Sequence, residues 1–120
     1  MPTVFLLDDD PSVLTATSRL LSSAGWQAET FTDPHSFLEQ VQTQCPPVVV
    51  IDILMPLMNG LEVQKRLRSV SPSTQVIILT SKDDPSVRAE AMEAGASAFF
   101  LKQDDEDALL AGVASAVAGK

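Results

Sequence analysis

The stretch VVVIDILMP, residues 48–56, decides the fold because it ends an apolar run on an acid. Its first four residues are all β-branched. A run of this kind with no polar alternation is typical of a strand that is covered on both faces of a parallel sheet. Asp52 follows directly, and a carboxylate at the rim of a core is costly unless a partner offsets its charge. The sequence therefore predicts a buried strand that is followed directly by an acid in need of a partner.

Strand-like and helix-like segments alternate on either side of this stretch. Apolar runs predict strands at 3–7, 47–51, 75–80 and 98–101, and the alternating segment QAETF predicts a strand at 27–31. Apolar residues at helical spacing predict helices at 11–25, 34–42, 60–68, 85–95 and 106–118. Five β/α repeats indicate the α/β class, with three layers in which a parallel sheet lies between helices.

Three of the predicted helices follow an Asp-Pro pair, which begins at Asp10, Asp33 and Asp84. Aspartate is a favourable N-cap and proline is a favourable first helical residue, so these pairs indicate helix starts. Asp10 therefore has a structural role as a cap. No such role is predicted for Asp8 and Asp9, its two acidic neighbours.

Composition limits the class of protein. The 120 residues fit one domain, 1–120, with 45% hydrophobic residues and no apolar run near the roughly 18 needed to span a membrane. A single cysteine, Cys45, and an acidic N-terminus without a basic leader favour the cytoplasm. Eight basic against sixteen acidic residues give a net charge of −8, which argues against direct nucleic-acid binding by this chain.

Side chains suited to chemistry follow the carboxyl ends of the predicted strands, where ligands bind in an open parallel sheet. Three acids brought together there repel one another unless a cation joins them. Hard oxygen ligands of this kind suit Mg²⁺, which commonly bridges to a phosphate, and an amine or a hydroxyl can contact phosphoryl oxygens. The residues concerned are Asp8, Asp9, Asp52, Thr80 and Lys102.

Four segments carry a resemblance to a known family: LLDDDPSVL, VVVIDILMPLMNGLEV, VIILTS and AGASAFFLKQ. Together they resemble the receiver domain of two-component response regulators, and the D-x-x-M-P-x-M-x-G pattern from Asp52 to Gly60 is the most specific part. The resemblance implies a flavodoxin-like sheet of order 2-1-3-4-5 with five helices. It also implies a phosphorylation-dependent signalling switch, which takes a phosphoryl group from a histidine kinase or phosphotransfer protein with Mg²⁺.

The resemblance assigns a role to each matching position. Asp52 is the expected phosphoacceptor, and Lys102 is expected to neutralise the phosphoryl charge. Thr80 is the expected switch hydroxyl, while Phe99 is interpreted either as the switch aromatic or as an ordinary core residue. Mg²⁺ would be held by four groups, of which Asp9 is the favoured direct ligand beside Asp8, Asp52 and the backbone carbonyl of Leu54.

The family also implies an output. Its relatives signal through the fourth helix, last strand and last helix, here roughly 85–118, often by forming homodimers. The motif spacing is most similar to receivers fused to a helix-turn-helix DNA-binding domain, so we expect a signalling domain whose output, transcription, lies beyond residue 120. Lys102-Gln103 departs from the usual Lys-Pro. Because a non-proline cis bond costs about 2.5–4 kcal/mol, we expect this bond to be trans.

Other functions remain open at this point. An aspartyl phosphatase would need a second acid two residues after the nucleophile, where this chain has Leu54. A degenerate receiver that serves only as a docking module is supported by Gln103. A flavin-binding relative would need a phosphate-cradling loop, and the acidic DDDPS segment would repel a phosphate. Lys82 could reinforce the phosphate site or be an ordinary solvated lysine.

Overall fold

A computed structural model describes residues 3–53, 58–104 and 106–118. Its strands are β1 (Thr3–Leu7), β2 (Gln27–Phe31), β3 (Val48–Ile51), β4 (Gln75–Thr80) and β5 (Ala98–Leu101). Its helices are α1 (Pro11–Ser23), α2 (Pro34–Gln44), α3 (Gly60–Val70), α4 (Pro85–Glu93) and α5 (Glu106–Ala118). All expected elements are present in the expected order, and their ends differ from the sequence prediction by no more than two residues.

The strands form one parallel sheet in the order β2-β1-β3-β4-β5, as predicted. β3 lies at its centre, and every residue of β3 is buried, which explains its unbroken apolar sequence. β2 lies at one edge and is mostly exposed, which explains its polar residues. The order reverses between β1 and β3, the position at which open α/β sheets place their ligands.

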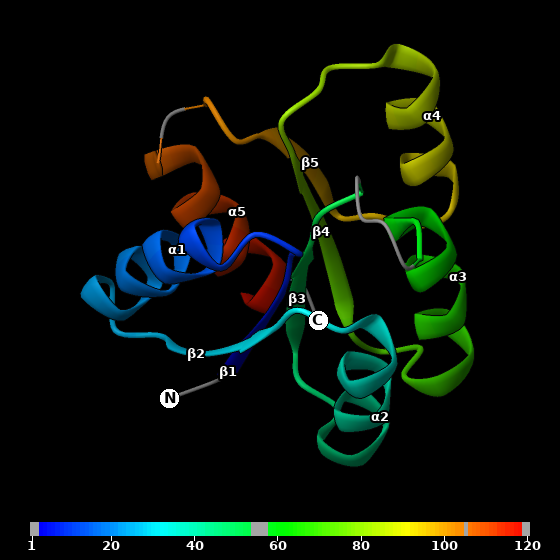
Figure 1. Cartoon of the computed structure of the whole chain (residues 1–120), viewed down its shortest axis with the longest axis horizontal. Coiled ribbons are helices and arrows are strands. Elements are labelled where there is room, and N and C mark those ends of the chain that lie inside the picture. The colour runs from blue at the N-terminus through cyan, green and yellow to red at the C-terminus, as the bar shows by residue number, and fades with distance from the viewer. Residues whose placement is uncertain (1–2, 54–57, 105, 119–120) are drawn as a thin grey trace.

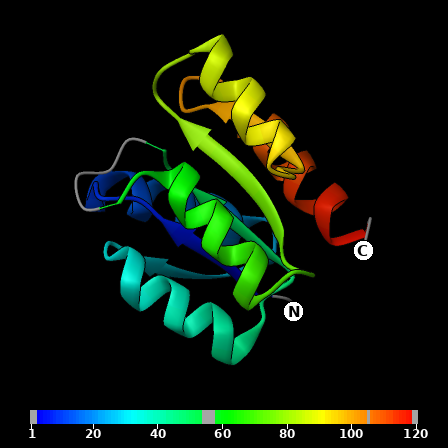
Figure 2. The same ribbon diagram turned by 90° about the vertical axis from the view of Figure 1, so that its right-hand side faces the viewer.

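Helices cover both faces of the sheet and give the three layers that the sequence predicts (Figure 1). α1 and α5 lie on one face, whereas α2, α3 and α4 lie on the other (Figures 1 and 2). Side chains of β3 alternate between the two cores, with Val48 and Val50 facing α1 and α5 and Val49 and Ile51 facing the other helices. The core on the α2–α4 side also holds the ring cluster Phe5, Phe31 and Phe37.

The three Asp-Pro pairs begin helices, as predicted. The carboxylates of Asp10, Asp33 and Asp84 each accept a backbone N–H from the first turn of α1, α2 and α4, respectively. Hydrogen bonds also lower the pKa of two of these acids, chiefly from the His35 N–H to Asp33 and from the Ser86 hydroxyl to Asp84. These caps fix the starts of α1, α2 and α4 at the edge of the sheet where β1, β2 and β4 end.

Candidate functional site

The sheet register brings the predicted site residues together. Leu7 pairs with Ile51, so the residues that follow them, Asp8 and Asp52, leave neighbouring strands side by side. On the other side of β3, Thr80 is the last residue of β4 and pairs with Leu101, which Lys102 follows. The order β1-β3-β4-β5 thus places groups from four strands along one edge of the sheet.

Three carboxylates gather at this edge. An oxygen from each of Asp8, Asp9 and Asp52 lies within 4.8 Å of an oxygen of the other two. Asp8 and Asp52 are each only 4% exposed, whereas Asp9 is exposed to solvent. Like charges at this spacing raise each other's energy, and burial of two of them weakens the solvation that would offset it. A cation is therefore needed among them.

Lys102 supplies one cation. Its Nζ lies 2.8 Å from Oδ2 of Asp8 and 3.4 Å from Oδ2 of Asp52, and its side chain is 20% exposed. Burial alone would lower the pKa of Lys102, but the hydrogen bond to Asp8 and the charge of Asp52 outweigh it and hold the pKa above its ordinary value. The ammonium therefore stays charged at neutral pH. It is the partner that the buried carboxylate of Asp52 was predicted to need.

Asp8 has a structural role that the sequence analysis did not assign to it. Its Oδ1 accepts the backbone N–H of Asp10 at 2.9 Å, while its Oδ2 faces Lys102. The sequence predicts no structural role for Asp8, and that prediction was wrong. The buried carboxylate of Asp8 holds the backbone of the loop at Asp10, and the carboxylate of Asp10 caps α1 by accepting the Ser12 N–H. Of the three acids, Asp9 is the one whose carboxylate faces solvent.

The backbone around Asp52 is held on both sides. The Asp52 N–H donates to the carbonyl of Leu7 at 2.9 Å, and the Gly60 N–H donates to the carbonyl of Ile53 at 3.0 Å. A Cβ at Gly60 would lie 2.5 Å from the carbonyl oxygen of Asp52 and 2.6 Å from Cα of Ile53. Only glycine lets α3 begin this close to the phosphoacceptor candidate. Asn59 caps α3 through its side chain.

Thr80 and Phe99 lie on adjacent strands near this cluster. Thr80 is 2% exposed, and its carbonyl accepts the N–H of Lys102 at 2.7 Å. Phe99 is 6% exposed and packs in the α2–α4 core, and its role as the switch aromatic stays a prediction. The guanidinium carbon of Arg88 lies 5.1 Å from the ring centroid of Phe99, a cation–π contact that the sequence analysis did not predict.

The turn after β5 contains the departure from the family pattern. No cis peptide bond occurs within the described ranges, so Lys102-Gln103 is trans, as predicted. Asp104 closes the turn instead, because its carboxylate accepts the Leu101 N–H at 2.8 Å and its own N–H donates to the Leu101 carbonyl at 2.9 Å. Lys102 still reaches the acids without the family proline.

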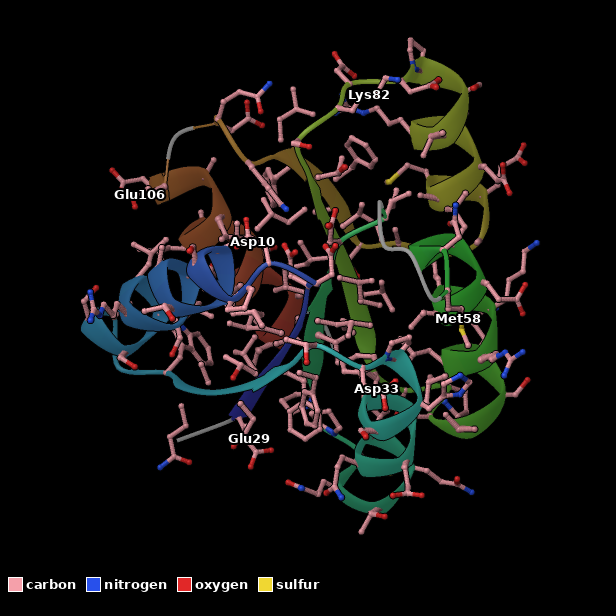
Figure 3. The ribbon with its side chains drawn as sticks, viewed as in Figure 1. Asp10, Glu29, Asp33, Met58, Lys82 and Glu106 are labelled. Atoms are coloured by element: carbon pink, nitrogen blue, oxygen red, sulfur yellow. The ribbon has the colours of Figure 1, made fainter. Side chains whose placement is uncertain are left out.

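Some predicted positions stay apart from the cluster or outside the description. Leu54, whose carbonyl was expected to contact the metal, is outside the described residues. Lys82 lies exposed in the loop before α4, and Met58 is buried just before α3 (Figure 3). The charge of Lys82 is a minor cause of the lowered pKa of Asp84, after the hydrogen bonds from Ser86 and Val87. His35, in the first turn of α2, is exposed.

The arrangement suits a divalent cation and a phosphoryl group. Carboxylate oxygens from three side chains form the hard donor set that Mg²⁺ prefers, and Asp9 leaves the cluster open on its solvent side. Lys102 adds a single positive charge that a phosphoryl oxygen can contact. Within the described ranges, this group is the only cluster of three or more metal-ligating side chains.

Two polar residues of α3, Gln64 and Arg68, were also missed. Gln64 bonds to the carbonyl of Ala91 in α4, and Arg68 bonds to the carbonyl of Ala94, the C-cap of α4. The sequence held one signal that could have predicted the burial of Gln64, which is its place beside the apolar Val63 in an amphipathic helix.

Comparison with known proteins gives the family. The sequence matches the family model described as response regulator receiver domain over residues 4–114. The response regulator protein TodT of Pseudomonas putida is 33% identical over 95% of this chain and 50% of its own length. MprA of Mycolicibacterium vanbaalenii, a response regulator, is 33% identical over 90% of this chain and 47% of its own length. The chain thus spans about half the length of these curated relatives.

Solved structures agree with the fold. The signal receiver domain of the putative response regulator NarL from Mycobacterium tuberculosis is 28% identical with a TM-score of 0.88, over 99% of this chain and 98% of that one. A receiver domain protein from Methanospirillum hungatei has a TM-score of 0.92 at 21% identity, over 99% of this chain and 95% of that one, which supports the fold alone. No described helix has the length and hydropathy needed to cross a membrane. From the family match and these relatives, the chain belongs to the response regulator receiver domain family.

Proposed function

We propose that the chain is a phosphorylation-dependent switch that accepts a phosphoryl group onto Asp52 from a histidine kinase or phosphotransfer protein. One observation carries the proposal. The carboxylate of Asp52 is 4% exposed and lies both within the acidic cluster and 3.4 Å from the ammonium of Lys102. Helix capping would need none of these partners, whereas phosphoryl transfer depends on positioning and charge neutralisation.

In the transfer, an oxygen of Asp52 forms a bond to phosphorus as the bond from phosphorus to the donor nitrogen breaks, and the electron pair of that bond leaves with the donor imidazole. The backbone bonds on either side of Asp52 hold its carboxylate in one orientation for this attack. Lys102 turns from Asp8 toward the phosphoryl oxygens and balances their charge. Thr80, the last residue of the adjacent strand β4, would donate its hydroxyl to a phosphoryl oxygen.

Mg²⁺ would be held by Asp8, Asp9 and Asp52, with Asp9 as the ligand most open to an arriving ion. When bound, the ion neutralises charge on the carboxylates and on the transferred phosphoryl group. Since Asp8 also pairs with Lys102, occupation of the cluster frees the ammonium for its role toward the phosphoryl group.

The output of the switch follows from the change in surface. Phosphorylation favours one of two conformations because the phosphoryl group contacts them differently. We propose that phosphorylation changes the face formed by α4, β5 and α5. Two copies of the chain would then form a homodimer through this face and so control a DNA-binding domain fused beyond residue 120. A 36% identical relative from Mycobacterium tuberculosis is a probable transcriptional regulatory protein. The chain itself acts as a cytoplasmic signalling domain that promotes its own phosphorylation, rather than as an enzyme with a separate substrate.

Incubation with acetyl phosphate and Mg²⁺, followed by intact-mass measurement, tests the proposal. The wild type should gain the mass of one phosphoryl group, and this gain should require the metal. Asp52→Asn should abolish the gain, while Asp83→Asn, a change at an exposed aspartate before α4, should leave it unchanged. A gain that persists in Asp52→Asn would contradict the assignment of the acceptor. A wild type that gains nothing would favour a module that only docks.

A further inference from the structure

Helix α3 holds the C-terminal end of α4 by two side-chain hydrogen bonds. Nε2 of Gln64 donates to the carbonyl of Ala91 at 2.9 Å, and Nη1 of Arg68 donates to the carbonyl of Ala94 at 2.8 Å. Gln64 and Arg68 are four residues apart, so they lie one turn apart on the same face of α3. Both acceptors belong to the last residues of α4 or its cap.

Gln64 is not explained by packing alone. Its side chain is completely buried, and its Oε1 has no hydrogen-bond partner among the described residues. An unpaired buried acceptor is costly, and a hydrocarbon side chain of the same length would fill this space without that cost. What the amide adds over a hydrocarbon is the bond to Ala91. That carbonyl also accepts the N–H of Ala96, so both of its lone pairs are used.

Arg68 completes the attachment at the helix end. The carbonyl of Ala94 lies where the helix dipole is negative, and a guanidinium is favoured there. Gly95 follows with a φ of +101°, a left-handed conformation that favours glycine. A Cβ at this position would collide with the guanidinium, so the missing side chain leaves room for Arg68. The backbone of the turn is thus shaped to admit this contact.

The N-terminal half of α4 is held differently. Ala91 is the only buried residue of α4, and the residues before it are exposed or half-buried. Val87 packs against the core, and Arg88 lies over the ring of Phe99. In the loop that leads from Thr80 into the helix, residues 81–83 are exposed. The end of α4 nearest the phosphorylation site therefore has fewer buried attachments than the far end.

We propose that Gln64 and Arg68 are positioning residues that make the C-terminal end of α4 a fixed pivot. Movement on phosphorylation is then confined to the loop after β4 and the first half of α4. The inference rests on the proposed function for the stimulus, but the attachment itself is a property of the unphosphorylated chain. It specifies which part of the output face changes and which part stays constant.

Amide hydrogen exchange in the unphosphorylated protein tests the attachment directly. Gln64→Met keeps the length of the side chain and removes both the donor and the unpaired acceptor, and Arg68→Met removes the guanidinium. Each should speed exchange at the N–H groups of Ala94, Gly95 and Ala96 by about five-fold, the factor for one net hydrogen bond. The midpoint of thermal unfolding of Gln64→Met should not fall, because the costly acceptor is gone.

The matched control is Arg66→Met, which removes an exposed arginine of α3 whose guanidinium pairs with Glu62 of the same helix. It should leave exchange at the end of α4 unchanged. Unchanged exchange in both Gln64→Met and Arg68→Met would overturn the pivot, as would an equal effect in Arg66→Met. A general loss of stability in Gln64→Met would likewise assign the amide to packing and overturn it.

Amide hydrogen exchange in the presence of beryllofluoride and Mg²⁺, which mimic the phosphoryl group, tests whether movement is confined to the loop after β4 and the first half of α4. In the wild type, exchange should change at residues 81–88 and stay within two-fold at residues 94–96, whereas in the two variants the change should spread to residues 94–96. Equal changes at both ends of α4 in the wild type would overturn the pivot. If beryllofluoride changes exchange nowhere in the wild type, both the proposed switch and the confinement of its movement are overturned. Exchange in the unphosphorylated variants would still decide whether the bonds from Gln64 and Arg68 hold the end of α4.

Discussion

Lys102→Met removes the one described cation from the acidic cluster while keeping most of the side-chain stem. In the wild type, the ammonium lies 2.8 Å from Asp8 and 3.4 Å from Asp52. Without it, three carboxylates remain within 4.8 Å of one another, and two of them are 4% exposed. We expect the variant to fold but to be less stable when Mg²⁺ is absent.

The size of the loss follows from the geometry. Two unit charges 4.8 Å apart interact by about 3.5 kcal/mol at an effective dielectric constant near 20. Removal of one partner from a buried ion pair typically costs about 3–5 kcal/mol. Because Lys102 is 20% exposed and Asp9 faces water, solvent reduces this cost. We therefore expect the free energy of unfolding to fall by about 2–3 kcal/mol at neutral pH.

Urea unfolding followed by the fluorescence of Trp26, the only tryptophan, measures this loss. Excess Mg²⁺ should restore most of the lost stability, because the ion takes the place of the ammonium charge. Lys65→Met, at an exposed position of α3, should change stability by no more than about 0.5 kcal/mol. If Lys102→Met proves as stable as Lys65→Met without the metal, or if Mg²⁺ stabilises both variants equally, the electrostatic account of the site is wrong.

The pH dependence has a definite sign. The folded-state pKa of Lys102 is raised above the ordinary value of 10.5. Its contribution to stability is therefore fully present below pH 10.5 and is lost as the pH rises through the folded-state pKa. The difference in free energy of unfolding between wild type and Lys102→Met should be constant at neutral pH and shrink above pH 10.5.

Three further changes test other parts of the account. Gly60→Ala places a Cβ 2.5 Å from the carbonyl oxygen of Asp52, so the free energy of unfolding in urea should fall by about 2 kcal/mol. Phosphorylation by acetyl phosphate should also slow. A substitution that changes neither stability nor rate would refute the close approach. Thr80→Val removes a buried hydroxyl and should still gain the mass of one phosphoryl group. The change in amide hydrogen exchange that beryllofluoride causes at residues 81–88 should become smaller, and an undiminished change would argue against the switch role of Thr80. Asp33→Ala should lower stability at neutral pH, and the loss should vanish in titrations below pH 3.8, since hydrogen bonds lower the pKa of Asp33; a loss that persists in acid would argue against this cap.

Much of the fold could be predicted because local signals and topology agree. The β-branched run of β3 indicates a strand that is buried on both faces, and Asp-Pro pairs mark helix starts at Asp10, Asp33 and Asp84. Once five β/α units are recognised, the carboxyl ends of the strands must meet at one edge. The convergence of Asp8, Asp9 and Asp52 therefore follows from sequence position alone.

The contacts within the site could not be predicted in the same way. Sequence position places Lys102 at the edge, but only the packed structure shows that its ammonium pairs with Asp8 more closely than with Asp52. The bond from Gln64 to Ala91 joins residues 27 apart in sequence and depends on how α3 packs against α4. Such contacts arise from helix packing, which spacing along the chain does not encode.

The central claim is that the carboxylates of Asp8, Asp9 and Asp52 form one divalent-cation site. A crystal soaked in Mn²⁺, which accepts the same oxygen ligands as Mg²⁺, tests it through the anomalous signal of the metal. We expect one strong peak within bonding distance of the carboxylates of Asp9 and Asp52, and its loss in Asp9→Asn. A crystal that binds Mn²⁺ only elsewhere on the surface, with no peak at these carboxylates, would contradict the account.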